Sequence, residues 1–329
     1  MCLDSKLTQC MNGPRNFTEG TAEALEEMLS PRVDITGIEG ESDEEKVNAI
    51  VFELYKEALS VVNLAANMLD GASAGKGGWP RNQAICAGLL VRIAKFMLVV
   101  TQLSAKGDRA EVVSALNRSI MESAINLEFL IRANDDKYFD QFVRFSLGPE
   151  RELYDLIQAN VAARKGVVWP IERRMLESVN DVCSASGVKI EDAARKYGDW
   201  GGGTRERLKA LNKEEQYVSM LRLPSHAVHG TWVDLYKNHL EHNVEADVYN
   251  PDPRFSWVDA RLLAPIAVLV LEAVKPYLER FFSDTAGSKL LQRRTVDLQQ
   301  RIVEADTAHE KLFGKKASTS AAPTGSPGT

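Results

Sequence analysis

Residues 81–103, RNQAICAGLLVRIAKFMLVVTQL, decide the fold class of this chain. Apolar side chains recur there at three- and four-residue steps, at Ile85, Leu89, Ile93, Phe96, Val100 and Leu103. This is the period of one face of an α-helix. The stretch is also long enough to span a bilayer, but Arg92 and Lys95 lie in its middle, and a charge at the bilayer centre is costly. We therefore interpret it as a core helix and expect no membrane partner.

Composition limits the classes of protein to which the chain can belong. It has 329 residues, of which 44% are hydrophobic, so it can form a large core and is not wholly disordered. Forty Lys and Arg residues against 46 Asp and Glu residues give a formal net charge of -6. Because indiscriminate polyanion binding requires a basic excess, that class is disfavoured, whereas a small local basic site is compatible with this balance.

Helical periodicity continues on both sides of this stretch, and no run alternates like a β-strand. We therefore predict an all-α protein. Ser42 and Glu45 form an S-x-x-E capping box, which predicts the start of the first long helix. A helical bundle domain is expected over residues 42–283, with a helical insertion at 148–213.

The two ends of the chain differ from this bundle. Residues 1–41 lack clear periodicity and are expected to be poorly ordered. Residues 286–313 are predicted to form an amphipathic C-terminal helix that lies on the body. A short coiled-coil seam is the alternative, since apolar residues lie seven apart at Leu291, Leu298, Ala305 and Leu312. Residues 314–329 are rich in Ser, Thr, Ala, Pro and Gly and are expected to form a disordered tail.

Four of the five histidines lie within seventeen residues, at His226, His229, His239 and His242. Each pair has i, i+3 spacing, so each could place two imidazoles on one helix face. Glu241 or Asp234 could add an oxygen ligand. The H-E-x-x-H spacing of metalloproteases is absent, and the second pair lies in a polar run that suits solvent exposure. A histidine metal site is therefore only a third hypothesis, and we expect no metal and no cofactor.

The segment Arg222-Leu-Pro-Ser225-His226-Ala-Val-His229-Gly230 suggests catalysis more sharply. Six residues separate Arg222 from His229. An imidazole exchanges a proton near neutral pH, and a guanidinium offsets charge on a phosphate as a 2′-hydroxyl attacks, so such a pair can cleave RNA without a metal. The alternative is a surface ion pair for Arg222 and a structural hydrogen bond for His229.

Arg118 and Glu122 lie one helical turn apart on a face that is otherwise apolar. Because a buried charge must be paired, one interpretation is a structural salt bridge inside the bundle. The functional interpretation places this pair beside Ser225 and His229 across a cleft, where Glu122 could orient the imidazole.

The motif Leu116-Asn-Arg118-Ser-Ile-Met-Glu122 is followed about a hundred residues later by Ser225-His-Ala-Val-His229-Gly230. With the preceding helix around Arg92, this pattern resembles the bacterial family called domain of unknown function 5677. The resemblance covers roughly residues 45–282. That family is similar to the HEPN helical superfamily, whose active members carry R-x(4–6)-H and act as metal-independent RNases, often as dimers in toxin or antiphage systems.

The resemblance implies a HEPN-like helical bundle in which Arg222 and His229 match the HEPN pair at its longest spacing. Leu223 departs from the polar residue that commonly follows the HEPN arginine, and Pro224 lies between the two. If Arg222 is not the catalytic arginine, Arg118 is the better candidate for the cation that faces the phosphate.

These inferences predict a cytoplasmic, metal-independent endoribonuclease that acts on RNA, with a homodimer or another protein partner docked through helices. His229 would act as general acid and base, Arg222 or Arg118 would contact the phosphate, and Glu122 and Ser225 would be orienting groups. The alternative is a non-catalytic helical interaction module, in which the polar residues fix helix packing as a network.

Overall fold

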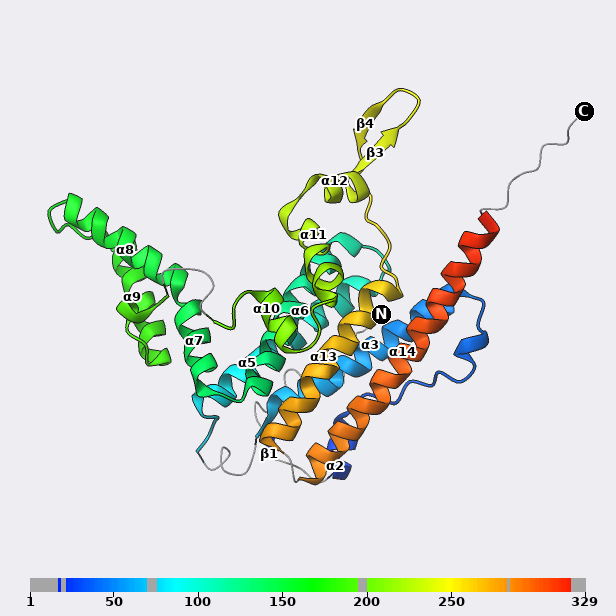
Figure 1. The fold of residues 1–329 in the computed structure, drawn as a ribbon, viewed down its shortest axis with the longest axis horizontal. Coiled ribbons are helices and arrows are strands. Elements are labelled where there is room, and N and C mark those ends of the chain that lie inside the picture. Colours follow the sequence, from blue (N-terminus) through cyan, green and yellow to red (C-terminus); the bar gives the residue numbers. More distant parts are fainter. Residues whose placement is uncertain (1–16, 19–21, 70–75, 195–199, 283–284, 321–329) are drawn as a thin grey trace, which may run out of the picture.

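Five long helices form the body of the protein (Figure 1): α3 (Glu44–Asn67), α5 (Arg81–Ser104), α6 (Ala110–Ala133), α13 (Ala260–Phe281) and α14 (Ala286–Ser320). The computed structural model describes residues 17–18, 22–69, 76–194, 200–282 and 285–320. The all-α prediction is confirmed. In these residues, β structure is limited to an isolated bridge and two small pairs, namely parallel β1 (Phe17–Thr18) with β2 (Met68–Leu69) and antiparallel β3 (Leu240–Asn243) with β4 (Val248–Pro251).

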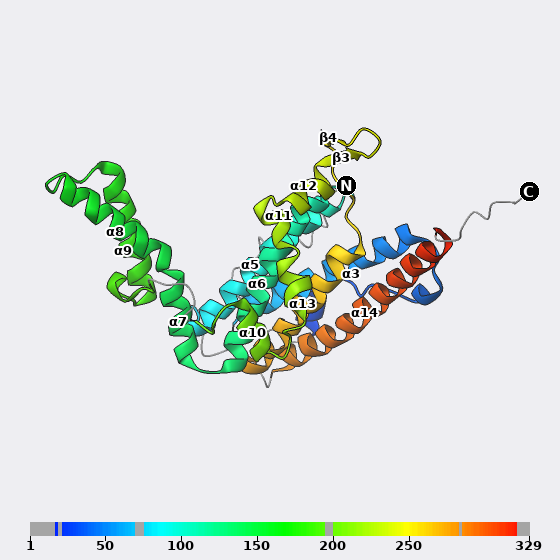
Figure 2. The same cartoon turned by 45° about the horizontal axis from the view of Figure 1, so that its top comes forward.

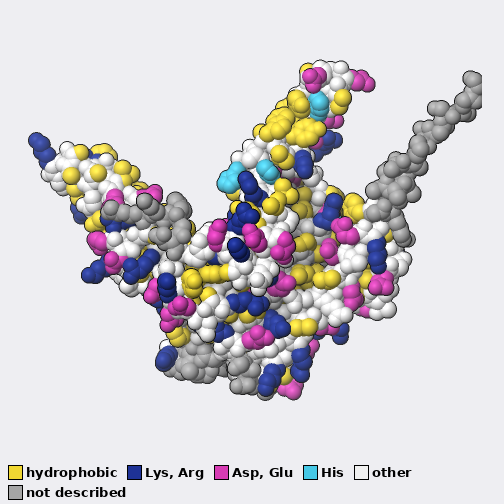
Figure 3. Space-filling view, in the orientation of Figure 1, with side chains coloured by type: hydrophobic (Ala, Val, Ile, Leu, Met, Phe, Trp, Pro, Cys, Tyr) yellow, Lys and Arg dark blue, Asp and Glu magenta, His cyan; other side chains and the backbone are white. Residues whose placement is uncertain are grey.

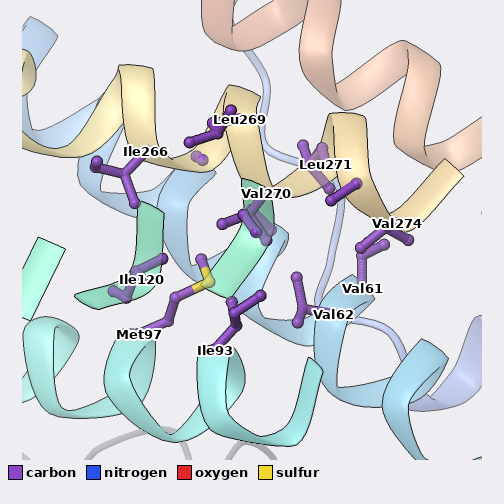
Figure 4. Close-up of a cluster of buried hydrophobic side chains, with 14 of the residues drawn as sticks. Val61, Val62, Ile93, Met97, Ile120, Ile266, Leu269, Val270, Leu271 and Val274 are labelled. Atoms are coloured by element: carbon purple, nitrogen blue, oxygen red, sulfur yellow. The ribbon is translucent and has the colours of Figure 1, made fainter. Parts of the chain in front are cut away.

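The core lies between α3, α5, α6 and α13 (Figure 4). Ile93 and Met97 of α5 point toward Val270 of α13, and Ile120 of α6 closes one end of the cluster. All four side chains are fully buried. Burial of one such side chain contributes roughly 1.5–3 kcal/mol, so this shared apolar interior is the main stabilising feature of the bundle.

Two aspartates set where α3 and α13 begin. Asp43 accepts a hydrogen bond from the Glu45 amide at 3.1 Å and is the N-cap of α3. The capping box predicted at Ser42 is therefore wrong by one residue, because the carboxylate of the next residue takes that role. Asp259 caps α13 in the same way, and the helix then runs through Pro265 and Pro276 without interruption.

The segment before α3 is more ordered than its sequence suggests. Within residues 1–41, α2 (Ala22–Met28) and the 3₁₀ turn η1 (Ile38–Gly40) pack against α14, whereas residues 1–16 and 19–21 lie outside the described part. Leu25 and Ile38 are buried in the main core. Single apolar residues on such short elements do not produce a helical period in the sequence. The apolar periodicity therefore did not predict that this segment is ordered.

The C-terminal helix α14 lies on α3 and α13. Its heptad-spaced residues are buried against the body of the same chain, namely Leu291, Leu298, Ala305 and Leu312. The helix continues to Ser320, so 314–320 are helical where a disordered tail was expected, and 321–329 lie outside the described residues. Extension of an existing helix costs little, since nucleation is already complete.

A helical projection, which we call the helical arm (residues 148–193), leaves the bundle after α7 (Asp136–Ser146) (Figures 1 and 2). It contains α8 (Gly148–Ala163), α9 (Pro170–Ser186) and the short η2 (Ile190–Asp192). Val179 and Cys183 belong to a small apolar cluster separate from the main core. The insertion predicted over 148–213 therefore has two parts, because α10 (Thr204–Ala210) packs back onto α6.

A second projection, which we call the hairpin arm (residues 232–254), contains α12 (Trp232–Asn238) and the β3–β4 hairpin. It follows the π-helical turn η3 (Val218–Arg222) and α11 (Ser225–His229). The sequence did not predict this hairpin. All four residues of β4 are exposed, so no alternation of apolar and polar residues marks the strand.

By length and composition, one helix in the described ranges could cross a membrane, namely α5. Of its most apolar window, 44% is buried inside the protein. The buried part packs against α3 and α6.

Candidate functional site

Arg222 and His229 lie in two consecutive helical elements, η3 and α11, which are joined by a turn at Leu223 and Pro224. Proline lacks an amide hydrogen and its ring collides with the carbonyl four residues earlier. Here the preceding turn is widened, since the Leu223 amide donates to the Val218 carbonyl at 3.0 Å, five residues back. Leu223 and Pro224 both keep right-handed helical dihedral angles. Arg222 is thus the last residue of η3, and His229 is the last residue of α11.

Packing of α11 on α6 brings Arg118 to Ser225. The Arg118 Nε donates to the Ser225 hydroxyl at 3.2 Å, and its Nη1 donates to the Glu122 carboxylate at 3.0 Å. Ser225 in turn donates to the Leu221 carbonyl at 2.6 Å. Two segments about a hundred residues apart in the sequence thus meet through these side chains.

The imidazole of His229 and the guanidinium of Arg222 are exposed. Neither side chain makes a hydrogen bond or ion pair with the part of the protein that the structure describes. The expected contact between Glu122 and His229 is therefore absent, since the carboxylate faces Arg118 along α6 instead. Both exposed groups can meet a ligand from solvent without first breaking an internal contact.

Arg207 of α10 is a neighbour of this site that the sequence did not indicate. Its side chain is buried, and its Nη1 donates to the carbonyls of Trp200 and Gly202 at 3.3 and 3.2 Å. Burial lowers the pKa of this guanidinium to about 10, and the charge of nearby Glu122 opposes that shift. The Glu122 carboxylate is thus within electrostatic reach of two cations, Arg118 and Arg207.

The loop before α10 explains how Arg207 is held. Gly201 has a φ of +58°, and a Cβ at this position would lie 2.8 Å from the ring of Phe129. The guanidinium of Arg207 lies 4.3 Å from the ring centroid of Trp200. The run Trp200-Gly-Gly-Gly is typical of a helix break, but a break alone does not identify the side chain that the loop encloses.

The four clustered histidines do not form a metal site. His226 bonds Thr231 through Nδ1 at 2.6 Å, while His242 stacks on Tyr249 with ring centroids 4.4 Å apart. His239 lies 3.5 Å from the Asp234 carboxylate. Across the described ranges, no three His, Cys, Asp or Glu side chains are arranged to hold a metal ion. The metal hypothesis is not supported, because α12 and the hairpin carry the second pair into separate contacts.

The chemistry available at this site is that of cations beside a titratable group. Arg118 uses Nε and Nη1 internally, and among the described residues its Nη2 has no partner. The Arg222 guanidinium and the His229 imidazole add a second cation and a proton-exchanging group on α11 and the turn before it. Such a set suits an anionic ligand, with phosphate the group that arginine binds best.

Comparison with known proteins identifies one family. The model of the family of unknown function DUF5677 matches residues 83–247, half of the chain. The match runs from α5 to the turn of the β3–β4 hairpin, so it includes Arg118, Glu122, Ser225 and His229. No curated protein and no solved structure matches the chain. The chain belongs to the family of unknown function DUF5677.

Proposed function

We propose that this protein is a metal-independent endoribonuclease whose site lies where α11 meets α6. The observation that carries the proposal is the contact of Arg118 with Ser225, one turn before an exposed and unpaired His229. Arg118, which has a free amino group, is thereby fixed on α11 one helical turn before a proton-exchanging imidazole, and this order supports general acid–base cleavage of a phosphodiester.

In the proposed reaction, His229 takes the proton of a ribose 2′-hydroxyl. The 2′-oxygen forms a bond to the adjacent phosphorus, and the bond from phosphorus to the 5′-oxygen breaks. The imidazolium returns the proton to the leaving 5′-oxygen. The products are a 2′,3′-cyclic phosphate and a 5′-hydroxyl end, so atoms and charge balance without a metal or an external reagent.

The positions of Arg118 and Arg222 relative to His229 suggest that each arginine contacts a different phosphate of the RNA. Arg222 precedes His229 by seven residues, about 10 Å along a helix axis, whereas Ser225 precedes it by four, about 6 Å. Arg118 is hydrogen-bonded to Ser225 and is therefore the better candidate for the cation that binds the reacting phosphate. We assign Arg222 to a neighbouring phosphate, and Glu122 and Ser225 to the positioning of Arg118.

The substrate in this proposal is RNA that the protein selects, because a net charge of -6 does not favour indiscriminate polyanion binding. We further propose that the activity is cytoplasmic and belongs to a toxin or antiphage system, as the HEPN resemblance implies.

The test is cleavage of total cellular RNA by purified protein in EDTA. We expect discrete fragments from the natural protein, and a rate lower by about 10²–10⁴-fold for His229→Ala, the range lost with a general acid–base group. His242→Ala is the matched control, because this imidazole belongs to the hairpin arm, and its rate should be unchanged. No cleavage by the natural protein, or equal cleavage by His229→Ala, would overturn the proposal.

The second candidate function is a non-catalytic interaction module. The observation that favours it is the amount of apolar surface on the two arms, where large side chains such as Trp169, Trp232 and Tyr236 are exposed. This surface can serve an interaction whether or not the protein cleaves RNA.

A further inference from the structure

The helical arm exposes an unusual number of large apolar side chains. They lie on α8, α9 and the loop that joins them: Leu156, Val167, Trp169, Ile171, Met175 and Val182. Trp169 is 52% exposed although it begins α9. Large apolar side chains exposed together on one projection of a folded protein indicate a site of interaction.

The hairpin arm exposes a second apolar surface. Its exposed side chains come from α12 and from both sides of the hairpin turn: Trp232, Val233, Leu235, Tyr236, Val244, Val248 and Tyr249. Trp232 packs on Tyr236 and Tyr249, with ring centroids 6.0 and 5.5 Å apart. These aromatic contacts therefore hold the hairpin against α12, yet each of the three residues remains roughly half exposed to solvent.

The ends of the two arms carry opposite charge. Residues 163–174 at the end of the helical arm contain four basic residues and one acidic residue, a net charge of +3. Residues 241–254 of the hairpin arm contain four acidic residues and one basic residue, a net charge of -3. Arg164 is paired with Glu172 at 2.5 Å, whereas Lys165 and Arg173 form no ion pair with any described residue.

The arms are also placed for contact with another molecule rather than with each other. Both rise from the bundle as separate projections in the two views of the fold (Figures 1 and 2). The space-filling view shows apolar side chains on both projections and acidic side chains at the end of the hairpin arm (Figure 3). No pair of elements from the two arms is in substantial contact among the described residues.

We infer that a second copy of this chain docks through the arms, with each helical arm on the hairpin arm of its partner. A two-fold axis makes this exchange reciprocal, so the two contacts form together and the assembly closes as a dimer. The arms of one copy expose on the order of 1,000 Å² of apolar side chain, compared with the roughly 800 Å² per partner of a standard interface. Opposite charge at the two arm ends fixes which arm meets which.

The inference does not depend on the proposed nuclease activity, and its test is the mass of the full chain in solution. Sedimentation of the natural protein should give a dimer at micromolar concentration. Charge reversal at the end of the helical arm (K165E/R173E/R174E) should give a monomer, because both arm ends are then acidic. Charge reversal at the end of the hairpin arm (E241K/E245K/D247K) should also give a monomer, because both arm ends are then basic.

Mixing makes the test decisive. The variant with two acidic arm ends and the variant with two basic arm ends should each be monomeric alone. An equimolar mixture of the two should form a dimer that contains one chain of each variant. Arg293→Glu on the exposed face of α14 is the control, and its dimer should be unchanged. Circular dichroism verifies that each variant is folded. A natural protein that stays monomeric up to about 100 μM, or a dimer that survives either reversal, would overturn the inference.

Discussion

The contact of α14 with α3 and the contact of α11 with α6 both contain arginines and a glutamate, yet they use them differently. In the first, Glu57 is fully buried and meets Arg301 at 2.6 Å and Arg294 at 2.9 Å. In the second, Arg118 keeps a free amino group beside an exposed His229. Burial of the ion-paired Glu57 indicates a role in folding, whereas exposure of His229 and the free amino group of Arg118 leave groups available for chemistry.

The largest effect on folding is expected at Glu57. Replacement by alanine leaves Arg294 and Arg301 without their shared carboxylate and removes the acceptor of the Val33 amide at 3.1 Å. Loss of one partner of a buried ion pair costs about 3–5 kcal/mol. Urea unfolding measures this loss. Glu53→Ala, on the exposed side of the same helix, is the control, and equal effects of the two variants would contradict the assigned role.

Gly201→Ala tests the loop around Arg207. The new Cβ would lie 2.8 Å from the ring of Phe129, at a backbone φ that alanine also disfavours. Gly77 also has a positive φ, +72°, but a Cβ there would meet open space, so the difference between Gly201→Ala and Gly77→Ala reports mainly on the collision. We expect the free energy of unfolding to fall by about 1–3 kcal/mol more at Gly201. A difference near zero would mean that the loop relaxes freely.

Asp43→Ala tests which residue caps α3. Loss of its hydrogen bond to the Glu45 amide should lower the free energy of unfolding by about 1 kcal/mol. Ser42→Ala should change it little, because the Ser42 side chain is not the cap. Thermal unfolding of the two variants measures both effects. A larger loss of stability for Ser42→Ala than for Asp43→Ala would mean that Ser42 caps α3.

The smallest effect on folding is expected at His229. Because its imidazole is exposed and has no internal partner in the described residues, His229→Ala should change stability by less than about 0.5 kcal/mol. The same variant should lose most of its proposed activity. A clear loss of stability would instead favour the polar network of a non-catalytic module.

Much of the fold could be predicted because helices are local. The apolar period that includes Ile93 and Val100 marks a core face without any knowledge of the partner helix, and both side chains are buried. The β3–β4 hairpin could not be predicted in this way, since β4 is exposed on both faces. The order of residues 22–41 depends on Glu57 and on α14, which are distant in sequence.

Contacts within the candidate site could be predicted only where a motif marked them. The contact of Arg118 with Ser225 joins two segments that the family resemblance had already connected. Arg207 was missed because its role depends on burial beneath the loop at Gly201, and burial of a single charged residue leaves no pattern in the sequence. Whether Glu122 faces Arg118 or His229 depends on side-chain direction, which spacing does not determine.

The most direct test of the central claim compares a single-stranded oligoribonucleotide with its 2′-deoxy analogue, each incubated with the natural protein in EDTA. The proposed chemistry requires the 2′-hydroxyl, so we predict that the ribonucleotide is cut to 2′,3′-cyclic phosphate ends and that the analogue stays intact. If both substrates are cut, or if neither is, the contact of α11 with α6 is not the ribonuclease site that we propose.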